Sequence, residues 1–386
     1  MKRKEFILKA GAIITATTFV SKFSFANSIE DSKLSNKRAK RPNPDVFSQP
    51  ILKAIALGIN APSPHNTQSW KFKIIDSVNM LLYVDENILL PETDPPSRQI
   101  HMGAGCFIET AVLGAQRYGY DADVVYFPEG YQGKVDFGQK PVASISLKKG
   151  RETKDPLEKY IESRQTNRRK YRGDIITHEE FDTLKTLSGA SHSKLKFINT
   201  NFEPYFNLFY KGFEIESKTF NTNEETRNLF RFNEQQRAEK GDGISIPQMG
   251  YKGLMAILAE KSLAMGDKEK WHSEKSISLS LKNVQKGIDS TKGIVVWYTE
   301  NNEFIDWIKS GRDFVRFSLA LIKLGLYAHP YNQVIQEYKE MEAVQSEMNA
   351  LLEIEAPQKI QMIVRLGRSS KPYYSYRREF NTYLVD

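Results

Sequence analysis

The sequence predicts an α+β fold in which one chain of 386 residues contains two related halves. Residues 70–74 (WKFKI) alternate apolar and basic side chains, which is typical of a half-buried strand. Residues 293–299 (GIVVWYT) are apolar almost throughout, which is typical of a fully buried strand. Segments with helical apolar spacing separate such strands, and the order helix, strand, apolar helix occurs twice. Helices stacked against a mixed sheet would bury both patterns.

The first predicted half covers residues 46–150. It begins with a helix over 48–59, where Ile51, Leu52, Ile55 and Ile59 share one face. Residues 103–119 are apolar on nearly every side, so we expect a central helix there. The strands expected in this half are 70–74, 80–84, 124–127 and 142–147.

The second predicted half covers residues 151–386. Thr177 and Glu180 have the spacing of a capping box, which predicts a helix over 177–187. A segment near 239–265, with Gly241, Gly243 and Pro247, is expected to act as a movable lid. The other elements expected here are strands 195–199, 293–299 and 360–366, mainly helical structure over 201–263, and a helix over 313–326.

The two halves correspond in the order of their elements. Helix 48–59 and strand 70–74 match helix 177–187 and strand 195–199. The apolar helix before Gly119 likewise matches the one before Gly325. Sequence identity between the halves is low, so the predicted repeat depends on this order.

The N-terminus predicts an exported protein. A basic start, a short uncharged stretch and the small residues Ser24-Phe25-Ala26 form a leader over residues 1–26. Arg3-Lys4-x-Phe6-Ile7-Leu8-Lys9 resembles a twin-arginine signal; an ordinary secretory signal or an uncleaved membrane tether are the alternatives. Residues 27–45 are interpreted as a linker. Cleavage would remove five basic residues and Glu5, which lowers the net charge from +8 to +4. The leader predicts a periplasmic location for the mature chain.

Composition excludes several classes of function. Cys106 is the only cysteine and there are six histidines, so neither a disulfide framework nor a thiolate zinc site is expected, and no metal is predicted. Lys and Arg are scattered rather than interleaved with aromatic residues, which argues against nucleic acid as a partner. The chain has no glycine-rich dinucleotide fingerprint. The apolar stretch of the leader is too short for a comfortable membrane span, and we expect no stable membrane insertion once the leader is removed.

Three segments are candidates for a binding site. The first, Ala61-Pro62-Ser63-Pro64-His65-Asn66-Thr67-Gln68-Ser69-Trp70, is stiffened by two prolines and rich in hydrogen-bonding groups; a structural proline turn is the alternative. The second, Arg164-Gln165-Thr166-Asn167-Arg168-Arg169, would place Arg164, Thr166 and Arg168 on one side of an extended chain, as a phosphate clamp or a solvated basic run. The third is Ser375-Tyr376-Arg377-Arg378, which could also be a frayed basic tail.

Together these segments resemble the FMN-dependent nitroreductase superfamily. The first resembles its APSxxNxQPW signature, with Ser69 in place of the proline before tryptophan, and the second resembles its RxSxR motif. The resemblance implies FMN as cofactor. It implies phosphate contacts from Arg164, Thr166, Arg168, Arg377 and Arg378, and flavin-ring contacts from Ser63, His65, Asn66 and Gln68. An extra residue before Tyr171 leaves Arg168 and Arg169 as alternatives for the phosphate site.

The order of the motifs resembles the Acg-type branch of that superfamily. Family dimers build each FMN site from two chains, whereas here the first loop lies in one half and the basic motifs lie in the other. The resemblance implies a nitroreductase-like fold with two degenerate halves in one chain, a monomer acting as an internal pseudo-dimer, and one FMN per chain. No catalytic residue is assigned, although His65 and His329 are expected to line the site.

Two functions fit this resemblance. The first is an oxidoreductase that transfers hydride or electrons through FMN N5 to a small electrophile such as a nitro compound or a quinone. The second is a flavin-binding or flavin-sequestering protein whose lid closes the site and prevents turnover. The substrate and the electron donor are not identified by the sequence.

Overall fold

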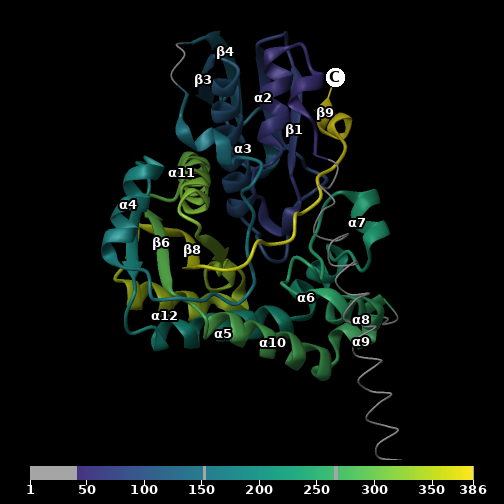
Figure 1. Cartoon of the computed structure of the whole chain (residues 1–386), viewed down its shortest axis with the longest axis vertical. Helices are drawn as coiled ribbons and strands as arrows, with labels where there is room; N and C mark the ends of the chain where they lie inside the picture. The colour runs from purple at the N-terminus through teal and green to yellow at the C-terminus, as the bar shows by residue number, and fades with distance from the viewer. Residues whose placement is uncertain (1–40, 151–153, 265–267, 386) are drawn as a thin grey trace, which may run out of the picture.

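The computed structural model describes residues 41–150, 154–264 and 268–385. The predicted leader (1–26) and most of the predicted linker (27–45) lie outside the described residues. In the described part, two sheets lie on either side of a pair of long helices, and further helices cover the lower end of the molecule (Figure 1). These residues contain no helix that is both long and apolar enough to cross a membrane. The predicted α+β class is confirmed.

The first sheet has the strand order β3-β4-β2-β1-β9. Trp70 and Phe72 of β1 are buried as the alternation predicted, and β1–β2, β2–β4 and β3–β4 are all antiparallel pairs. The elements of this half are α2 (Pro50–Gly58), β1 (Trp70–Ile74), β2 (Asn79–Val84), α3 (Arg98–Arg117), β3 (Tyr120–Tyr126) and β4 (Ala143–Lys149).

The second sheet has the order β5-β6-β8-β7, again with antiparallel neighbours. Its central strand β6 is almost wholly buried, as its apolar sequence predicted. The corresponding elements are α4 (His178–Ser188), β5 (Lys194–Ile198), β6 (Gly293–Thr299), α11 (Phe304–Lys323), β7 (Tyr327–Pro330) and β8 (Lys359–Gly367).

The two halves therefore share one topology. Replacing β1, β2, β3 and β4 by β5, β6, β7 and β8 converts the order β3-β4-β2-β1 into β7-β8-β6-β5. The helices that precede the first strand and follow the second also correspond, α2 with α4 and α3 with α11. The predicted boundary after residue 150 adjoins residues 151–153, which the structure does not describe, and it stays a prediction.

α3 and α11 cross through a reciprocal pair of glycines. A Cβ atom on Gly105 would lie 1.9 Å from the carbonyl oxygen of Ile308, and one on Gly311 would lie 2.0 Å from that of Met102. Real Cβ atoms do not approach backbone so closely, so the crossing requires glycine at both positions. Each glycine is the eighth residue of its helix, so the contact is symmetric between the halves.

The second half carries an insertion between β5 and β6, where the first half has a short turn. It contains α5 (Glu203–Lys218), α6 (Phe220–Asn228), α7 (Glu234–Lys240), α8 (Gly253–Ala264), α9 (Lys268–His272) and α10 (Glu274–Ile288). α12 (Glu342–Leu352), between β7 and β8, packs against α5.

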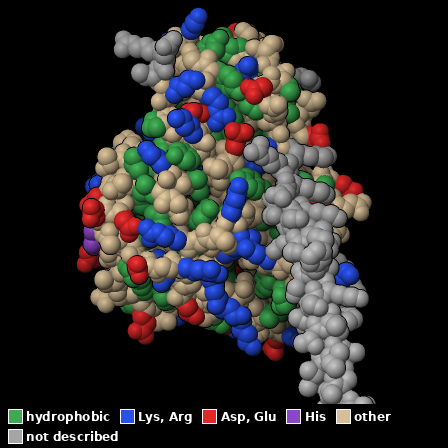
Figure 2. Space-filling view, viewed as in Figure 1, with side chains coloured by type: hydrophobic (Ala, Val, Ile, Leu, Met, Phe, Trp, Pro, Cys, Tyr) green, Lys and Arg blue, Asp and Glu red, His purple; other side chains and the backbone are tan. Residues whose placement is uncertain are grey.

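On the face drawn in Figure 2, a run of Lys and Arg side chains crosses the lower part of the molecule, whereas basic, acidic and apolar groups are mixed elsewhere.

The C-terminal segment leaves the second sheet and crosses to the first (Figure 1). Its last element, β9 (Leu384–Val385), pairs in parallel with β1 through Phe72 and Leu384. This crossing carries Ser375-Tyr376-Arg377-Arg378 to the first half, beside the loop between α2 and β1.

Several boundaries differ from the prediction. α3 begins at Arg98 rather than 103, and α11 begins at Phe304 rather than 313. Glu303 and Asp306 form a reciprocal capping box that starts α11. Glu is not among the preferred N-cap residues, so this start was missed. The strands β3, β7 and β9 and the helices α10 and α12 were also missed or shortened.

Candidate functional site

The C-terminal segment clamps the loop between α2 and β1. Arg377 is 3% exposed, and its Nε donates to the carbonyl of Ile59 at 2.7 Å. Its Nη2 donates to the carbonyls of Asn60 and Ala61 at 3.1 and 3.2 Å, and its Nη1 donates to Asn66 Oδ1 at 3.0 Å. The arginine thus fixes the loop that carries the first predicted motif.

The loop adopts a strained conformation. His65, Asn66 and Gln68 have φ values of 46°, 57° and 54°, in the left-handed region that non-glycine residues avoid. Each such residue costs about 1–3 kcal/mol unless the surrounding structure enforces it, and strain of this kind is concentrated at functional sites.

Gln68 is the hydrogen-bonding centre of the loop. Its Oε1 accepts from the backbone N–H of Arg378 at 3.2 Å and from the hydroxyl of Tyr383 at 2.5 Å. Its Nε2 donates to the carbonyls of Asn66 and Gly241, both at 3.0 Å. The side chain is fully buried, and its carboxamide is satisfied within the protein. In this arrangement Gln68 shapes the loop rather than facing a ligand.

The hydroxyl groups predicted for the site differ in their surroundings. Ser63 Oγ accepts from the backbone N–H of Gln68 at 3.0 Å but donates to no other described group. Thr166 is half-buried and makes no side-chain hydrogen bond within the described residues. Asn66 Nδ2 donates to the carbonyl of Tyr376 at 3.2 Å, which ties the loop to the C-terminal segment a second time.

Three guanidinium groups meet at Asn60: those of the buried Arg164 and Arg377 and that of the half-buried Arg41. Arg164 Nη2 donates to the carbonyl of Asn60 at 3.3 Å, Arg377 donates to the same carbonyl, and Arg41 Nη1 donates to Asn60 Oδ1. Among the described residues, none of the three pairs with a carboxylate. Burial, followed by the charge of Arg377, lowers the pKa of Arg164 to about 9. Buried charges without a counter-ion are costly, so this group has the character of an anion site.

Arg168 belongs to a second basic group. Arg168 forms neither a hydrogen bond nor an ion pair with the described residues, and burial is the main cause that lowers its pKa to about 10. Burial and then Arg168 lower the pKa of His65 to about 4. Burial, Arg365 and Arg168 lower that of His329 well below its usual value. Both imidazoles are therefore neutral at pH 7.

Alternation predicted that Arg164 and Arg168 lie on one side of the chain, whereas in the structure different cations act on the two side chains. Arg377 and Arg41 interact with Arg164, whereas the cation that acts on Arg168 is Arg365. The reason is that residues 164–168 leave a turn at Tyr160 and do not form a strand.

Arg169 points elsewhere. Its Nη1 donates to Ser370 Oγ at 3.2 Å and to the carbonyl of Lys371. Its carbonyl accepts from Arg365 Nη2 at 2.9 Å. Of the two alternatives left open by the sequence, Arg168 is the one whose charge acts on His65 and His329.

The predicted lid is fastened to the site. Asp242 pairs with Arg231 at 2.5 Å and with Arg378 at 3.6 Å, and Arg378 Nη2 also donates to the carbonyl of Thr67. Gln248 Nε2 donates to Ser375 Oγ at 2.8 Å. The lid thus contacts both the first loop and the C-terminal segment, and Arg378 serves as one of its anchors.

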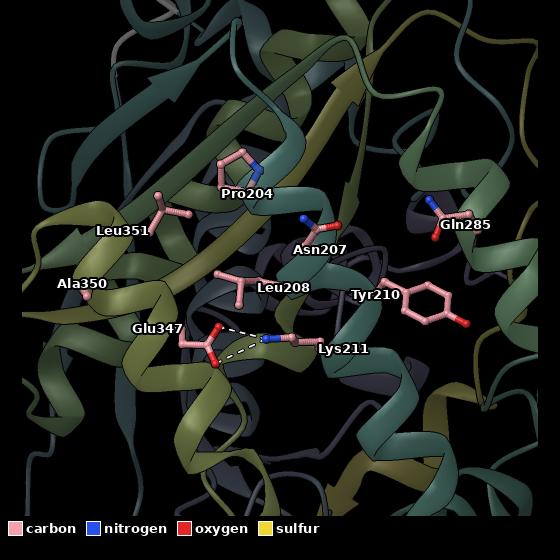
Figure 3. Close-up of a pocket in the computed structure, with 9 residues that line it drawn as sticks. All are labelled: Pro204, Asn207, Leu208, Tyr210, Lys211, Gln285, Glu347, Ala350 and Leu351. Carbon is pink, nitrogen blue, oxygen red and sulfur yellow. Dashed lines mark hydrogen bonds and ion pairs between the residues drawn. The ribbon is translucent and has the colours of Figure 1, made fainter.

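An open cavity lies elsewhere, between two helices of the insertion and α12. It measures about 710 Å³ between α5, α10 and α12, and an ion pair of 3.0 Å between Lys211 and Glu347 crosses it (Figure 3). None of the predicted site residues lines it, so the cavity does not bear on the three motifs.

The comparisons with known proteins point to nitroreductases. No family model matches the chain. Two proteins from two strains of Mycobacterium tuberculosis, each named "Putative NAD(P)H nitroreductase", are 27% identical to it over 82 residues. This stretch is 21% of the chain and spans only 24% of the relatives' length.

Solved structures of the same kind are similar at low identity. The FMN-dependent nitroreductase NfnB of Mycobacterium smegmatis, in complex with NADPH, matches with 13% identity and a TM-score of 0.35, over 58% of this chain and 94% of its own. A Bacteroides fragilis nitroreductase with bound FMN matches with 12% identity and a TM-score of 0.32, over 56% and 89%. These values do not establish family membership, so the family's activity is a proposal for this chain.

Residues that sequence reasoning missed complete both basic groups. Arg41 was assigned to the linker and Arg365 to the strand over 360–366. The basic residues near Pro42 gave a weak signal. Arg365 carried a stronger one, since a lone charge inside an apolar strand needs a buried partner.

Proposed function

We propose that the chain is an exported flavoprotein oxidoreductase of the nitroreductase kind that binds one FMN at this composite site. The group of Arg41, Arg164 and Arg377 carries the proposal, because two of these neighbouring cations are buried and none of the three has an ion-paired carboxylate among the described residues, which favours binding of an external anion. The phosphate of FMN is a dianion and suits such a group.

The donors around the loop fit the cofactor. Arg164 Nε, Gln165 Nε2 and His65 Nδ1 are buried and have no hydrogen-bond partner among the described residues. Buried polar atoms are normally satisfied, so these orphaned atoms support a ligand between the loop and the basic segment. We assign the phosphate to Arg164 and the group around it. Arg377 acts there mainly through its charge, because its donors hold the loop.

We assign the flavin ring to the neighbourhood of Ser63, His65 and Arg168. FMN, when bound, supplies the hydride chemistry. Arg168 provides a positive charge without a competing carboxylate, and Ser63 has an unused donor. His65 and His329 are neutral at pH 7, so they orient or accept hydrogen bonds rather than begin as proton donors.

One site per chain is supported by the matching loop of the second half. Asp313 lies two residues after Gly311, as Phe107 lies two residues after Gly105. Its carboxylate accepts from the backbone N–H groups of Ser191, His192 and Ser193 at 3.1, 2.9 and 2.6 Å. The donors of this loop are thus occupied by the protein's own anion. We therefore propose a monomer that acts as an Acg-type pseudo-dimer with a single site.

The lid favours a second candidate function. Its contacts through Asp242 and Gln248 close the loop from the insertion side, which would suit a protein that holds flavin without turnover. We place the oxidoreductase first, with a small electrophile such as a nitro compound or a quinone as substrate. Export by a twin-arginine signal to the periplasm remains part of the proposal, and it implies an electron donor other than cytoplasmic NAD(P)H.

The visible absorption spectrum of the purified chain tests the proposal. We expect a yellow protein with about one FMN per chain, and dithionite-reduced flavin that is reoxidised when a nitro compound or a quinone is added. Bound flavin that no acceptor reoxidises would favour sequestration. A colourless chain that does not take up added FMN would refute both functions.

A further inference from the structure

Arg41 precedes the first helix and reaches into the anion site. Its Nη1 donates to Asn60 Oδ1, and its Nη2 donates to the carbonyl of Ser375 at 3.0 Å. Its Nε is buried and has no hydrogen-bond partner within residues 41–150, 154–264 and 268–385, and its guanidinium lies 5.6 Å from the centre of the Tyr374 ring. It therefore bridges the first loop and the C-terminal segment, the two parts of the chain that enclose the site.

No carboxylate in the described part of the chain forms an ion pair with Arg41. Burial, followed by the charges of Arg377 and Arg164, lowers its pKa well below the usual value. The carboxylate that acts on it is Glu162, whose side chain is 53% exposed and already paired with Arg117 at 3.0 Å. A third cation in this position is unfavourable unless an anion joins the group.

The segment around Arg41 is fixed to the fold by contacts that do not need a ligand. Asp45 Oδ1 accepts from the hydroxyl of Tyr118 at 2.8 Å, and the rings of Phe47 and Phe380 lie 4.7 Å apart. These contacts hold the segment against the first half. The Arg41 guanidinium is oriented separately, by its own hydrogen bonds to Asn60 and Ser375.

We propose that Arg41 is a third guanidinium ligand of the cofactor phosphate, supplied by the segment that joins the predicted leader to the fold. The inference rests on the proposed function, since it takes the anion to be the phosphate of FMN. The Nε atoms of Arg41 and Arg164, which have no hydrogen-bond partner among the described residues, would then both be available to this ligand. The leader-proximal segment becomes part of the cofactor site.

The test compares FMN with riboflavin, which has the same ring and no phosphate. Dissociation constants of both flavins are measured by fluorescence quenching for the full chain, for Arg41→Ala, for Arg41→Lys and for the control Lys185→Ala. Lys185 is an exposed cation on α4, so its removal changes the net charge equally.

We expect Arg41→Ala to weaken FMN binding about 10–100-fold and to change riboflavin binding less than about twofold, because a charge-assisted hydrogen bond to phosphate is lost. Arg41→Lys should recover much of the FMN affinity, and Lys185→Ala should change neither constant. Equal weakening of both flavins would show that Arg41 only builds the loop and would overturn the inference. So would unchanged FMN binding by Arg41→Ala. An unaltered chain that binds neither flavin would instead refute the proposed function.

Discussion

Replacing Arg164 by methionine should weaken cofactor binding without destabilising the protein. Within the described residues, the Arg164 guanidinium makes one hydrogen bond, to the backbone carbonyl of Asn60 at 3.3 Å, and it is buried beside two other cations. Losing a single long hydrogen bond costs about 1 kcal/mol, whereas removing a buried charge with no counter-ion relieves a comparable or larger penalty. The free energy of unfolding without FMN should therefore stay the same or rise by about 1–3 kcal/mol.

Arg98→Met is the matched control. Arg98 is 1% exposed but is fully satisfied, with Glu337 at 2.8 Å and the carbonyls of Ile335, Ile360 and Gln361. Its removal breaks four hydrogen bonds, which should lower the free energy of unfolding by about 3–4 kcal/mol.

Urea denaturation without added FMN and an FMN titration measure both effects. We expect Arg164→Met to bind FMN about 10–100-fold more weakly while unfolding at the same or a higher urea concentration. If it lost as much stability as Arg98→Met, Arg164 would be a structural arginine. If FMN binding were unchanged, the phosphate assignment would be wrong.

Four further outcomes are expected. Asp313→Ala should lower the free energy of unfolding by about 3 kcal/mol, because three backbone N–H groups lose their acceptor. The same substitution should leave FMN affinity unchanged, and loss of FMN would contradict the single-site interpretation. Asp242→Asn should raise the rate at which an added quinone reoxidises reduced flavin in stopped-flow experiments, since a lid anchor is lost; an unchanged rate would exclude Asp242 as a gate. Gly105→Ala should prevent stable folding, because its Cβ would collide with α11. The control Gly325→Ala has open space around its Cβ but a φ of 70°, so it should lower the free energy of unfolding in urea by only about 1 kcal/mol. Equal effects of the two substitutions would contradict the helix crossing. Burial lowers the pKa of His101 from about 6.5 to about 4, so the contribution of the neutral ring to stability is complete above pH 6.5 and falls by about 2 kcal/mol at pH 5. His101→Phe should therefore lose less free energy of unfolding than the unaltered chain when urea denaturation is compared at pH 7 and pH 5. An identical pH dependence of the two proteins would contradict burial of a neutral ring.

Local patterns predicted the longer buried strands and the repeat, but not β7, β9 or the long-range pairing. β1 and β6 follow directly from alternation and from an unbroken apolar run, since burial of a strand determines both patterns. β9 has two residues, and its pairing with β1 depends on where the crossing C-terminal segment ends. No local pattern encodes that position.

The candidate site was predictable by its motifs and not by its geometry. The first loop and Arg377 could be singled out because prolines, hydroxyls and arginines cluster in the sequence. The split between Arg164 and Arg168 could not, because alternation predicts orientation only for an extended chain. Arg41 could not be assigned because its role comes from contacts with Asn60 and Ser375, which are distant in the sequence.

The two halves differ most at the position where the proposed function needs them to differ. In the second half, Asp313 satisfies the backbone donors of the loop after α4, and the loop is complete without a ligand. In the first half, the matching helix position is Phe107, which packs against Trp70 and Phe72. The loop after α2 instead has three guanidinium groups at Asn60, from Arg41, Arg164 and Arg377. An internal anion stabilises one loop, whereas the other has excess positive charge. The asymmetry therefore predicts that an added anion binds to one loop only, and that its binding stabilises the first half more than the second.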